Sequence, residues 1–424
     1  MTEPTQSTST QPSSCGVVLG DVEAARELLR GVVIETPVET SRWLSDLVGA
    51  PVVLKCENLQ RTGSFKSRGA YVRIARLTDE ERANGVVAAS AGNHAQGVAL
   101  AATMTGARST VFMPEGAPIP KERATRAYGA EVIFRGSSVD DALAAAKEYA
   151  DETGAVFIHP YDHPDIIAGQ GTVGLELLDQ VPDVRTVVVP AGGGGLLAGI
   201  ALAIKTSRPD VRVVGVQAEG AAAFPASLEA GSPVPLKSMR TMADGIAVGR
   251  PGDLTLAAVQ QYVDEIRTVG EESISRALLA VLERAKLVVE PAGAVGVAAL
   301  LDAPQDFGGS VFEGPVAVVL SGGNVDPLLL NKVIRHGLAA DGRYQVLRVI
   351  LTDAPGALAS LLALIAEEGA NVVQVSHGRT DPALSVDQVE VLLQLETRGK
   401  SHVDRLMGRL AESGYRAEST RTSA

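Results

Sequence analysis

Between about residues 21 and 340, short apolar runs alternate with longer helix-forming segments, and this rhythm constrains the fold more than any other feature of the chain. The runs are rich in valine and isoleucine, and Ala- and Leu-rich stretches separate them. They lie at residues 52–55, 86–90, 110–113, 131–134, 156–159, 186–190, 211–216 and 316–320. Continuous apolar strands separated by helices are typical of a mostly parallel sheet covered on both faces. The pattern predicts an α/β fold that binds ligands at the carboxyl ends of its strands.

The rhythm changes near residues 341–342, after which the pattern reads β-α-β-β-α-β. In the first helical segment, apolar residues recur at spacings of three and four, at Leu358, Leu361, Leu362 and Ile365. The flanking segments alternate with period two, as half-buried strands do. This order of elements predicts a separate ferredoxin-like domain over residues 343–424.

The ends and the composition narrow the class of protein. Residues 1–18 are rich in Ser, Thr, Pro and Gln, which predicts a disordered tail. No long apolar stretch and no signal-like start occur, so we expect a cytoplasmic protein that does not enter a membrane. The two cysteines, Cys15 and Cys56, offer no disulfide framework. The net charge of −12, without a long Lys/Arg run, argues against a nucleic-acid partner.

Four consecutive glycines, Gly192 to Gly195, follow the strand at 186–190 and lead into a helical segment. Unpaired N–H groups at a helix start favour an anion, so a phosphate is the natural guest, with a flexible tight turn as the alternative. No Lys-Ser/Thr pair follows the glycines, which argues against an NTP-binding loop. Glu219 lies where a ribose-binding acid could sit, but Leu197 replaces the third glycine of the dinucleotide fingerprint.

Lys66 stands at the start of a helix-forming stretch, within the segment 58–70. A cation is electrostatically disfavoured at a helix start, which hints at a functional role. A buried lysine has a lowered pKa and can attack an aldehyde, whereas a solvated surface lysine is the ordinary alternative.

Two further turns follow apolar runs. Ser90 to His94 joins a run directly to a helix and suits a carboxylate or phenolate, although helix capping by Ser90 and packing of His94 explain it equally. Ser321 directly follows the run at 316–320 and precedes two glycines. Together with Lys66 and the glycines, these turns supply what a pyridoxal-phosphate (PLP) site needs.

Four ordered motifs carry a family resemblance: Ser-Phe-Lys-x-Arg-Gly-Ala, Ser-Ala-Gly-Asn-His-Ala-Gln-Gly, Gly-Gly-Gly-Gly-Leu and Ser-Gly-Gly-Asn. They resemble the tryptophan-synthase-β fold type (fold type II) of PLP enzymes, and within it the threonine ammonia-lyases, over roughly residues 20–340. The resemblance implies two open, twisted, mostly parallel sheets in a catalytic domain at 19–340, with a smaller subdomain at about 52–158. The C-terminal region, with Asp353-Ala-Pro-Gly356, resembles an ACT domain.

The resemblance also implies roles for individual residues. Lys66 is expected to form the covalent link to the cofactor and then to act as the base at Cα. Ser321 is expected to face the pyridine nitrogen, and because a hydroxyl cannot protonate that nitrogen, the ring is a weaker electron sink, which suits elimination. The remaining cofactor-binding residues are Phe65, Asn93, Gly192, Gly193, Gly194, Gly195, Leu196 and Glu290. The substrate carboxylate is expected at Ser90, Ala91, Gly92, Asn93 and His94.

The implied reaction is deamination of L-threonine, and also of L-serine, in isoleucine biosynthesis or threonine catabolism. The alternatives are a serine dehydratase or racemase of the same fold, and a non-catalytic amino-acid sensor. Ala91 argues against a racemase, because racemases of this fold place a serine there. An amino-acid effector is expected near Asp353, Gly356 and Asn371, and the enzyme is expected to be a homo-oligomer, a dimer or tetramer. No HExxH motif occurs and no metal site is predicted, while a cation near Gln217–Gly220 stays open.

Overall fold

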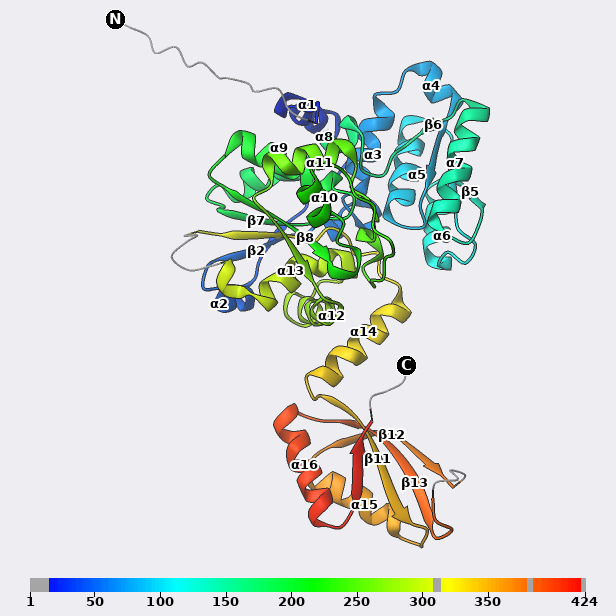
Figure 1. The fold of residues 1–424 in the computed structure, drawn as a ribbon, viewed down its shortest axis with the longest axis vertical. Helices are drawn as coiled ribbons and strands as arrows, with labels where there is room; N and C mark the ends of the chain where they lie inside the picture. The colour runs from blue at the N-terminus through cyan, green and yellow to red at the C-terminus, as the bar shows by residue number, and fades with distance from the viewer. Residues whose placement is uncertain (1–14, 308–313, 380–383, 421–424) are drawn as a thin grey trace, which may run out of the picture. The chain divides into compact units, whose positions relative to one another are not determined.

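The computed structural model describes residues 15–307, 314–379 and 384–420, which divide into two compact units at 1–326 and 327–424 (Figure 1). The sequence boundary near 340 was therefore too late. Helix α14 (Pro327–Ala340) belongs to the second unit. Its helical pattern was indistinguishable from that of the preceding α/β segments, because periodicity does not say which unit a helix packs against. Within the described residues, no helix is both long and apolar enough to cross a membrane.

The larger sheet of the first unit has six strands in the order β1-β2-β10-β7-β8-β9. All neighbours pair in parallel except β1, which is antiparallel to β2. The strands are β1 (Val38–Thr40), β2 (Val52–Lys55), β7 (Thr186–Pro190), β8 (Arg212–Ala218), β9 (Glu265–Val269) and β10 (Val316–Val319). Helices α8 and α9 cover one face and α12 and α13 the other (Figure 1). The predicted parallel sheet with two covered faces is thus confirmed.

The smaller sheet has four parallel strands in the order β5-β4-β3-β6. They are β3 (Val86–Ala89), β4 (Ser109–Met113), β5 (Glu131–Phe134) and β6 (Val156–Phe157). The predicted subdomain at 52–158 began too early, because β2 pairs with β10 of the larger sheet. A buried apolar run looks the same in either sheet, so the sequence could not assign it.

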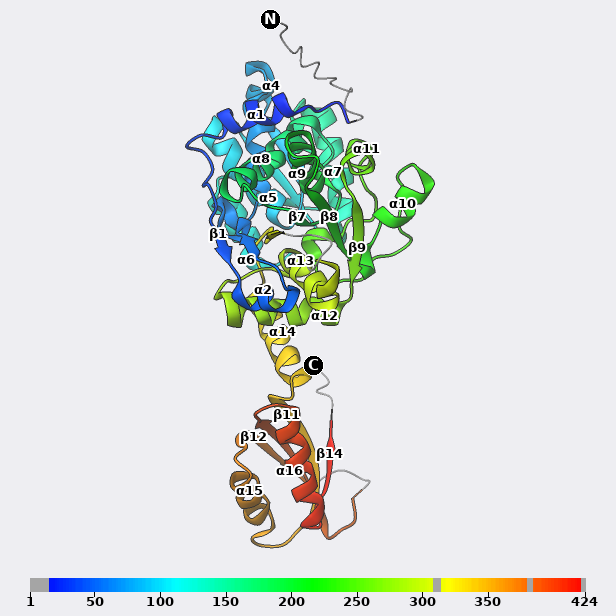
Figure 2. The ribbon, with the colours of Figure 1, turned by 90° about the vertical axis from the view of Figure 1, so that its left-hand side faces the viewer.

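The helices of the first unit fill the connections between strands. They are α1 (Leu19–Leu28), α2 (Arg42–Val48), α3 (Lys66–Ala75), α4 (Asp79–Asn84), α5 (Asn93–Thr105), α6 (Ile119–Ala127), α7 (Val139–Thr153), α8 (Pro164–Gln180), α9 (Gly195–Ser207), α10 (Phe224–Ala230), α11 (Asp253–Tyr262), α12 (Glu271–Ala280) and α13 (Pro291–Asp302). Short helical turns are η1 (Glu57–Leu59), η2 (Arg61–Gly63), η3 (Glu219–Ala221), η4 (Asp244–Ile246), η5 (Val281–Ala285) and η6 (Pro304–Asp306). Figure 2 shows α9 and α13 on either side of β7 and β8. Helices α3, α5, α9 and α13 begin at or next to the predicted site motifs.

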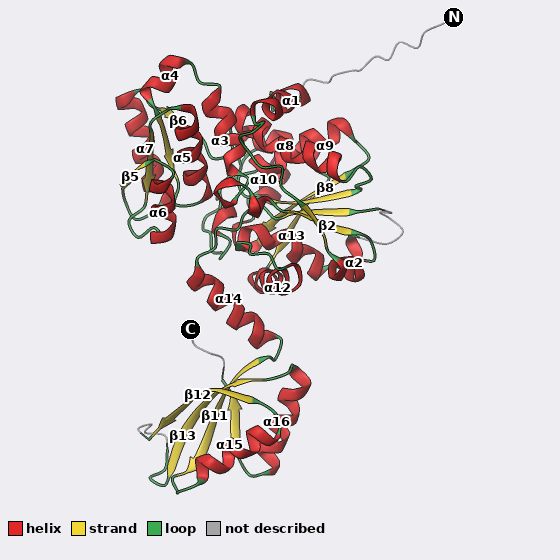
Figure 3. Ribbon diagram, turned by 180° about the vertical axis from the view of Figure 1, so that it is seen from behind, coloured by secondary structure: helices red, strands yellow, loops and turns green. Residues whose placement is uncertain are grey.

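The second unit is the predicted ferredoxin-like fold. Its antiparallel sheet has the order β12-β13-β11-β14, and α15 and α16 pack on one face (Figure 3). The elements are β11 (Tyr344–Thr352), α15 (Ala357–Glu367), β12 (Asn371–Gly378), β13 (Gln388–Glu396), α16 (Lys400–Glu412) and β14 (Arg416–Ser419). Buried Leu361 and Ile365 of α15 pack against alternate residues of β11 and β13, as the helical spacing predicted.

The N-terminal segment is ordered earlier than expected. Cys15 and Val17 are each only 1% exposed and belong to an apolar cluster with Val22 and Ala25 of α1. The prediction of a disordered tail is therefore wrong for residues 15–18, and residues 1–14 lie outside the described residues. Two small apolar side chains in an otherwise polar segment were too few to predict its burial from the sequence.

A cluster of charges is buried behind the start of α3. Arg68 is fully buried and donates to both carboxylate oxygens of Glu57 and of Glu176 over 2.6–2.9 Å. Lys55 donates to Glu176 over 2.6 Å. Burial raises the pKa of Glu57, but the charge and hydrogen bonds of Arg68, together with Lys55 and Thr36, hold the pKa below its ordinary value. Two cations and two anions thus balance, and Arg68 fixes the helix two residues after Lys66.

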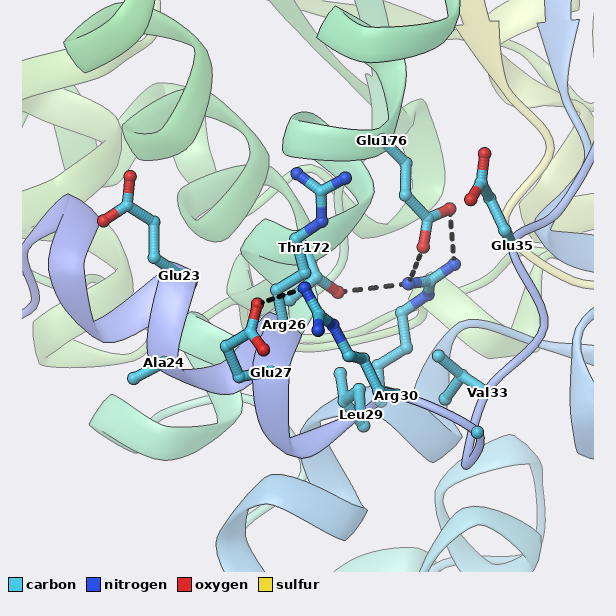
Figure 4. A pocket seen from close by; sticks show the side chains of 12 residues that line it. Glu23, Ala24, Arg26, Glu27, Leu29, Arg30, Val33, Glu35, Thr172 and Glu176 are labelled. Carbon is cyan, nitrogen blue, oxygen red and sulfur yellow. Dashed lines mark hydrogen bonds and ion pairs between the residues drawn. The ribbon is translucent and has the colours of Figure 1, made fainter.

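Arg68 donates to Thr172 Oγ1 over 3.1 Å and to Glu176 Oε1 over 2.6 Å, and all three residues line a charged hollow of about 730 Å³, in which Figure 4 labels Thr172 and Glu176. Its rim comes from α1 and the segment that follows it, and includes Glu23, Arg30 and Glu35. None of the predicted site residues lines this hollow.

Glu176→Ala should lower the free energy of unfolding by about 3 kcal/mol, because it leaves Lys55 and part of Arg68 buried without their counter-charge. The measurement is urea unfolding followed by circular dichroism. Arg42→Ala is the matched control, since Arg42 and Asp46 form an exposed pair 3.9 Å apart, and it should change stability by less than about 1 kcal/mol. Equal effects of the two substitutions on the free energy of unfolding would contradict a stabilising role of the buried charge cluster.

Candidate active site

Lys66 lies at the N-terminal end of α3, where two tertiary contacts hold the preceding loop. Phe65 N donates to Ser321 O over 3.2 Å, and Ser64 bridges to Gly322. The Lys66 amine donates to Pro160 O over 2.8 Å. Desolvation lowers the pKa of Lys66 to about 8, against an opposing pull from Glu290. The predicted nucleophile is therefore a desolvated amine, and it neighbours the residue predicted at the ring nitrogen.

Asn93 opens α5 and stands at the centre of a side-chain network. Its Nδ2 donates to Glu290 Oε1 over 2.7 Å, and its Oδ1 accepts from Asn324 Nδ2 over 2.9 Å. Asn324 Nδ2 also donates to Thr62 O over 2.6 Å. Thr62 has a φ of 63°, a conformation that non-glycine residues seldom adopt without support. The network therefore fixes the Asn93 amide and stabilises the loop before Lys66.

Glu290 is 3% exposed and precedes α13. Its backbone N donates to Gly322 O over 3.0 Å. A Cβ at Gly322 would lie 2.3 Å from Glu290 Oε1, so only glycine leaves room for the carboxyl group. Desolvation, together with the Asp244 carboxylate, raises the pKa of Glu290 to about 7. Its protonation state thus changes near neutral pH.

The glycine-rich loop runs from β7 into α9. A Cβ at Gly193 would lie 2.4 Å from the Tyr161 ring, and one at Gly192 would lie 2.9 Å from Ile246 Cα. Gly194 has a φ of 100°, which L side chains rarely adopt, and no side chain caps the helix that starts at Gly195. The N–H groups of the first turn of a helix lack intrahelical partners and favour an anion. The loop therefore has the form of a phosphate cradle.

The Ser90–His94 turn connects β3 to α5. Ser90 Oγ accepts from Gly92 N over 3.1 Å, and Gly92 precedes the helix without a side-chain cap. The His94 ring is buried and bonded to Ile158 O over 2.8 Å, and desolvation lowers its pKa to about 3. His94 is therefore a neutral packing residue, and only its backbone is available to the turn.

The predicted regulatory residues are not brought together. Asp353 and Gly356 lie between β11 and α15, where Asp353 pairs with Arg379 over 2.9 and 3.0 Å. Asn371 pairs in register with Glu396, which lies opposite Tyr344 at the other end of β11. The length of that strand separates Asn371 from Asp353 by roughly 30 Å. Within one chain, Asn371 therefore does not lie beside Asp353 and Gly356, because antiparallel pairing places the start of β12 at the far end of the sheet.

Two parts of the site were not predicted from the sequence. Asn324 lies in the quoted Ser-Gly-Gly-Asn motif, which was a sufficient signal, but received no role. Pro160 and Tyr161 contact Lys66 and the glycine loop, although they stand about 95 and 30 residues away in the chain. No local pattern marks such contacts.

A family profile described as "Pyridoxal-phosphate dependent enzyme" matches residues 29–322. The chain therefore belongs to this family. Over 399 residues it is 48% identical to an L-threonine ammonia-lyase of Thermotoga maritima, covering 94% of this chain and 98% of that protein. This match places it among the L-threonine ammonia-lyases of fold type II.

Two other relatives agree with this placement. A catabolic L-threonine dehydratase of Escherichia coli is 44% identical over 310 residues, covering 73% of this chain and 94% of its own length. The solved structure of a processed threonine deaminase isoform from Solanum lycopersicum has a TM-score of 0.72 and 37% identity, covering 75% of this chain and 92% of that one. The match to the Thermotoga maritima protein spans 399 residues and therefore extends well into the second unit, which begins at residue 327.

The residues present fit pyridoxal phosphate. Lys66 offers a desolvated amine to the aldehyde, and the uncapped start of α9 offers N–H groups to the phosphate. Side chains larger than hydrogen at Gly192 and Gly193 would collide with the protein wall. Asn93 and Ser321 both adjoin the loop that carries Lys66, because Asn324 links Asn93 to Thr62 and Ser321 O accepts from Phe65 N.

Glu290→Gln should change how stability depends on pH in the cofactor-free chain. Between its ordinary pKa of 4.5 and its folded pKa of about 7, Glu290 binds more protons folded than unfolded. The free energy of unfolding of the wild type therefore falls as pH rises through this window. Glu290→Gln cannot ionise, so its free energy of unfolding should rise relative to that of the wild type by up to about 3 kcal/mol. Urea unfolding at pH 5 and pH 8 measures the difference. The exposed Glu80→Gln serves as the control, and an equal pH response in wild type and Glu290→Gln would contradict the expectation.

Proposed function

We propose that this chain deaminates L-threonine by β-elimination, releasing 2-oxobutanoate and ammonia, and deaminates L-serine to pyruvate. The observation that carries the proposal is the desolvated Lys66 amine, which follows a loop bonded to Ser321 just after β10 and is itself bonded to the turn that packs on the glycine loop. The similarity to L-threonine ammonia-lyases along nearly the whole chain supports threonine as the substrate.

Pyridoxal phosphate, when bound, supplies an aldehyde for the substrate amine and a conjugated ring that makes the Cα proton acidic. Lys66 is the base that removes this proton. Its pKa of about 8 leaves part of the amine neutral near neutral pH, which a base requires. The pKa of an exposed lysine, about 10.4, would leave almost none.

The other residues bind and orient. The N–H groups of Gly192 to Leu196 would hold the phosphate, and those of the Ser90–His94 turn would hold the substrate carboxylate. Asn93, fixed by Glu290 and Asn324, would donate to the ring oxygen. Ser321 offers a hydroxyl rather than a carboxylate to the ring nitrogen, which favours elimination over reactions that store charge in the ring.

A serine racemase is the second candidate, and Ala91 disfavours it. Returning a proton to the opposite face of Cα requires an acid there, and an alanine side chain has no proton to give. The retained Lys66 and glycine loop likewise disfavour a sensor without catalytic activity.

Lys66→Ala should abolish the absorbance band of the lysine-bound cofactor and lower 2-oxo acid release by several orders of magnitude, because base and covalent anchor are lost together. A coupled 2-oxo acid assay with L-threonine and L-serine measures turnover. Chiral chromatography of the wild-type reaction is the companion measurement, with negligible D-amino acid expected. Activity retained by the variant, or D-serine formed as fast as pyruvate, would overturn the proposal.

The second unit is proposed to bind an amino-acid effector at the start of α15. Gly356 precedes this helix with a φ of 89° and no side-chain cap, and Asp353 is held beside it by Arg379. Exposed N–H groups there suit a carboxylate. Isoleucine is the first candidate, because it is the end product of the pathway that 2-oxobutanoate feeds.

If isoleucine binds the second unit with different affinity in two states of the enzyme, it must shift the threonine saturation curve of the intact chain. A chain ending at Asp326 should keep PLP binding and turnover but lose this response. Calorimetry and initial rates with and without isoleucine and valine measure both. The absence of binding and kinetic response in the intact chain, or the same response in the shortened chain, would reject the site.

A further inference from the structure

The turn at residues 159–162, between β6 and α8, contacts both Lys66 and the glycine loop. Its backbone is organised by one side chain. His159 Nδ1 accepts from Asp162 N over 2.8 Å and from Tyr161 N over 3.3 Å. The His159 ring also meets the Tyr161 ring edge-on, with centroids 4.7 Å apart.

An imidazole can accept at Nδ1 only while that nitrogen is unprotonated. Desolvation lowers the pKa of His159 to about 4, although Asp162 opposes this shift. The acceptor is therefore present throughout the neutral range. His159 serves the backbone of its own turn, and no proton transfer is needed for that role.

The turn reaches two parts of the cofactor site, Lys66 and the glycine loop, that lie far apart in the sequence. Pro160 O accepts the Lys66 amine over 2.8 Å. The Tyr161 ring lies so close to the glycine loop that a Cβ at Gly193 would be 2.4 Å away, and Tyr161 OH donates to Arg250 O over 3.2 Å. One turn thus limits the position of both the amine and the phosphate cradle.

The next residue secures the far side of the same loop. The Asp162 carboxylate accepts from the N–H groups of Asp253, Leu254 and Thr255 over 3.0–3.2 Å, which caps α11. Thr255 Oγ1 then donates to Gly193 O over 2.6 Å. Because Asp162 satisfies α11, the uncapped start of α9 is left as the anion site nearby.

We propose that His159 is a positioning residue of the cofactor site, because its Nδ1 holds the 159–162 turn that sets the Lys66 amine against Pro160 and the Tyr161 ring against the glycine loop. Freed of this acceptor, the Tyr161 and Asp162 N–H groups lose their partner within the protein. The turn then relaxes and no longer fixes the positions of the Lys66 amine and the glycine loop relative to each other. The inference rests on the proposed function only for the role of Lys66, since PLP binding can be measured without turnover.

Two substitutions separate the acceptor from the ring. His159→Asn keeps an acceptor at the position of Nδ1 but removes the ring, whereas His159→Phe keeps a ring beside Tyr161 but removes the acceptor. The cofactor-free chain is titrated with PLP, following the absorbance of the lysine-bound cofactor, to give Kd. We expect His159→Phe to raise Kd for PLP about tenfold or more, with kcat lowered and KM for threonine less affected. His159→Asn should stay within about threefold of wild type.

His163→Asn is the matched control, because His163 Nδ1 accepts from Asp165 N at the start of α8 and asparagine retains such a cap. It should bind PLP as the wild type does. If His159→Phe does not fold, Tyr161→Ala takes its place and should weaken PLP binding likewise.

The proposal is overturned if His159→Phe, or Tyr161→Ala in its place, binds PLP with the wild-type Kd. It is also overturned if His159→Asn is as impaired as His159→Phe, because the ring would then matter and the acceptor would not. The variants could differ in their Kd for PLP as expected while the wild-type chain does not deaminate threonine. That result would refute the proposed substrate and leave the positioning role of His159 in place.

Discussion

The site depends on keeping the Lys66 amine out of water at a helix start, where a cation is electrostatically disfavoured. Desolvation favours the neutral amine and lowers the pKa of Lys66 to about 8, although Glu290 opposes this shift. This arrangement needs a rigid support. The charge-balanced cluster of Arg68, Glu57, Glu176 and Lys55 supplies it, because it anchors the first turn of α3 to β2 and α8.

The remaining parts of the site are arranged around that amine by contacts between elements distant in the chain. The loop before Lys66 pairs with the end of β10, and Asn324 from the same end holds both Thr62 and Asn93. Glycines at positions 193 and 322 permit this closeness, since a Cβ at either would collide with Tyr161 or Glu290. Close packing, more than flexibility, explains why glycine stands at these two positions.

The second unit shows how the pairing of strands decides which residues lie close together. The order of its elements predicted a ferredoxin-like fold, and the structure has it. The predicted effector residues were nevertheless scattered, because the pairing of β12 with β13 carries Asn371 to the opposite end of the sheet from Asp353. Proximity to a motif in the sequence did not translate into proximity in space.

The sequence by itself determined the fold class, the strands made of continuous apolar residues, the ferredoxin-like unit and the motifs that contain Lys66, Asn93, the glycine loop and Ser321. Local periodicity and a run of glycines are properties that neighbouring residues carry. The edge strands β1 and β9 escaped notice, since half-exposed strands lack a continuous apolar run. Only the tertiary structure decided that β2 joins the larger sheet, that Cys15 and Val17 are buried, and that the 159–162 turn meets Lys66. Those outcomes depend on desolvation and on packing between residues far apart in the chain, and no short stretch of sequence encodes either.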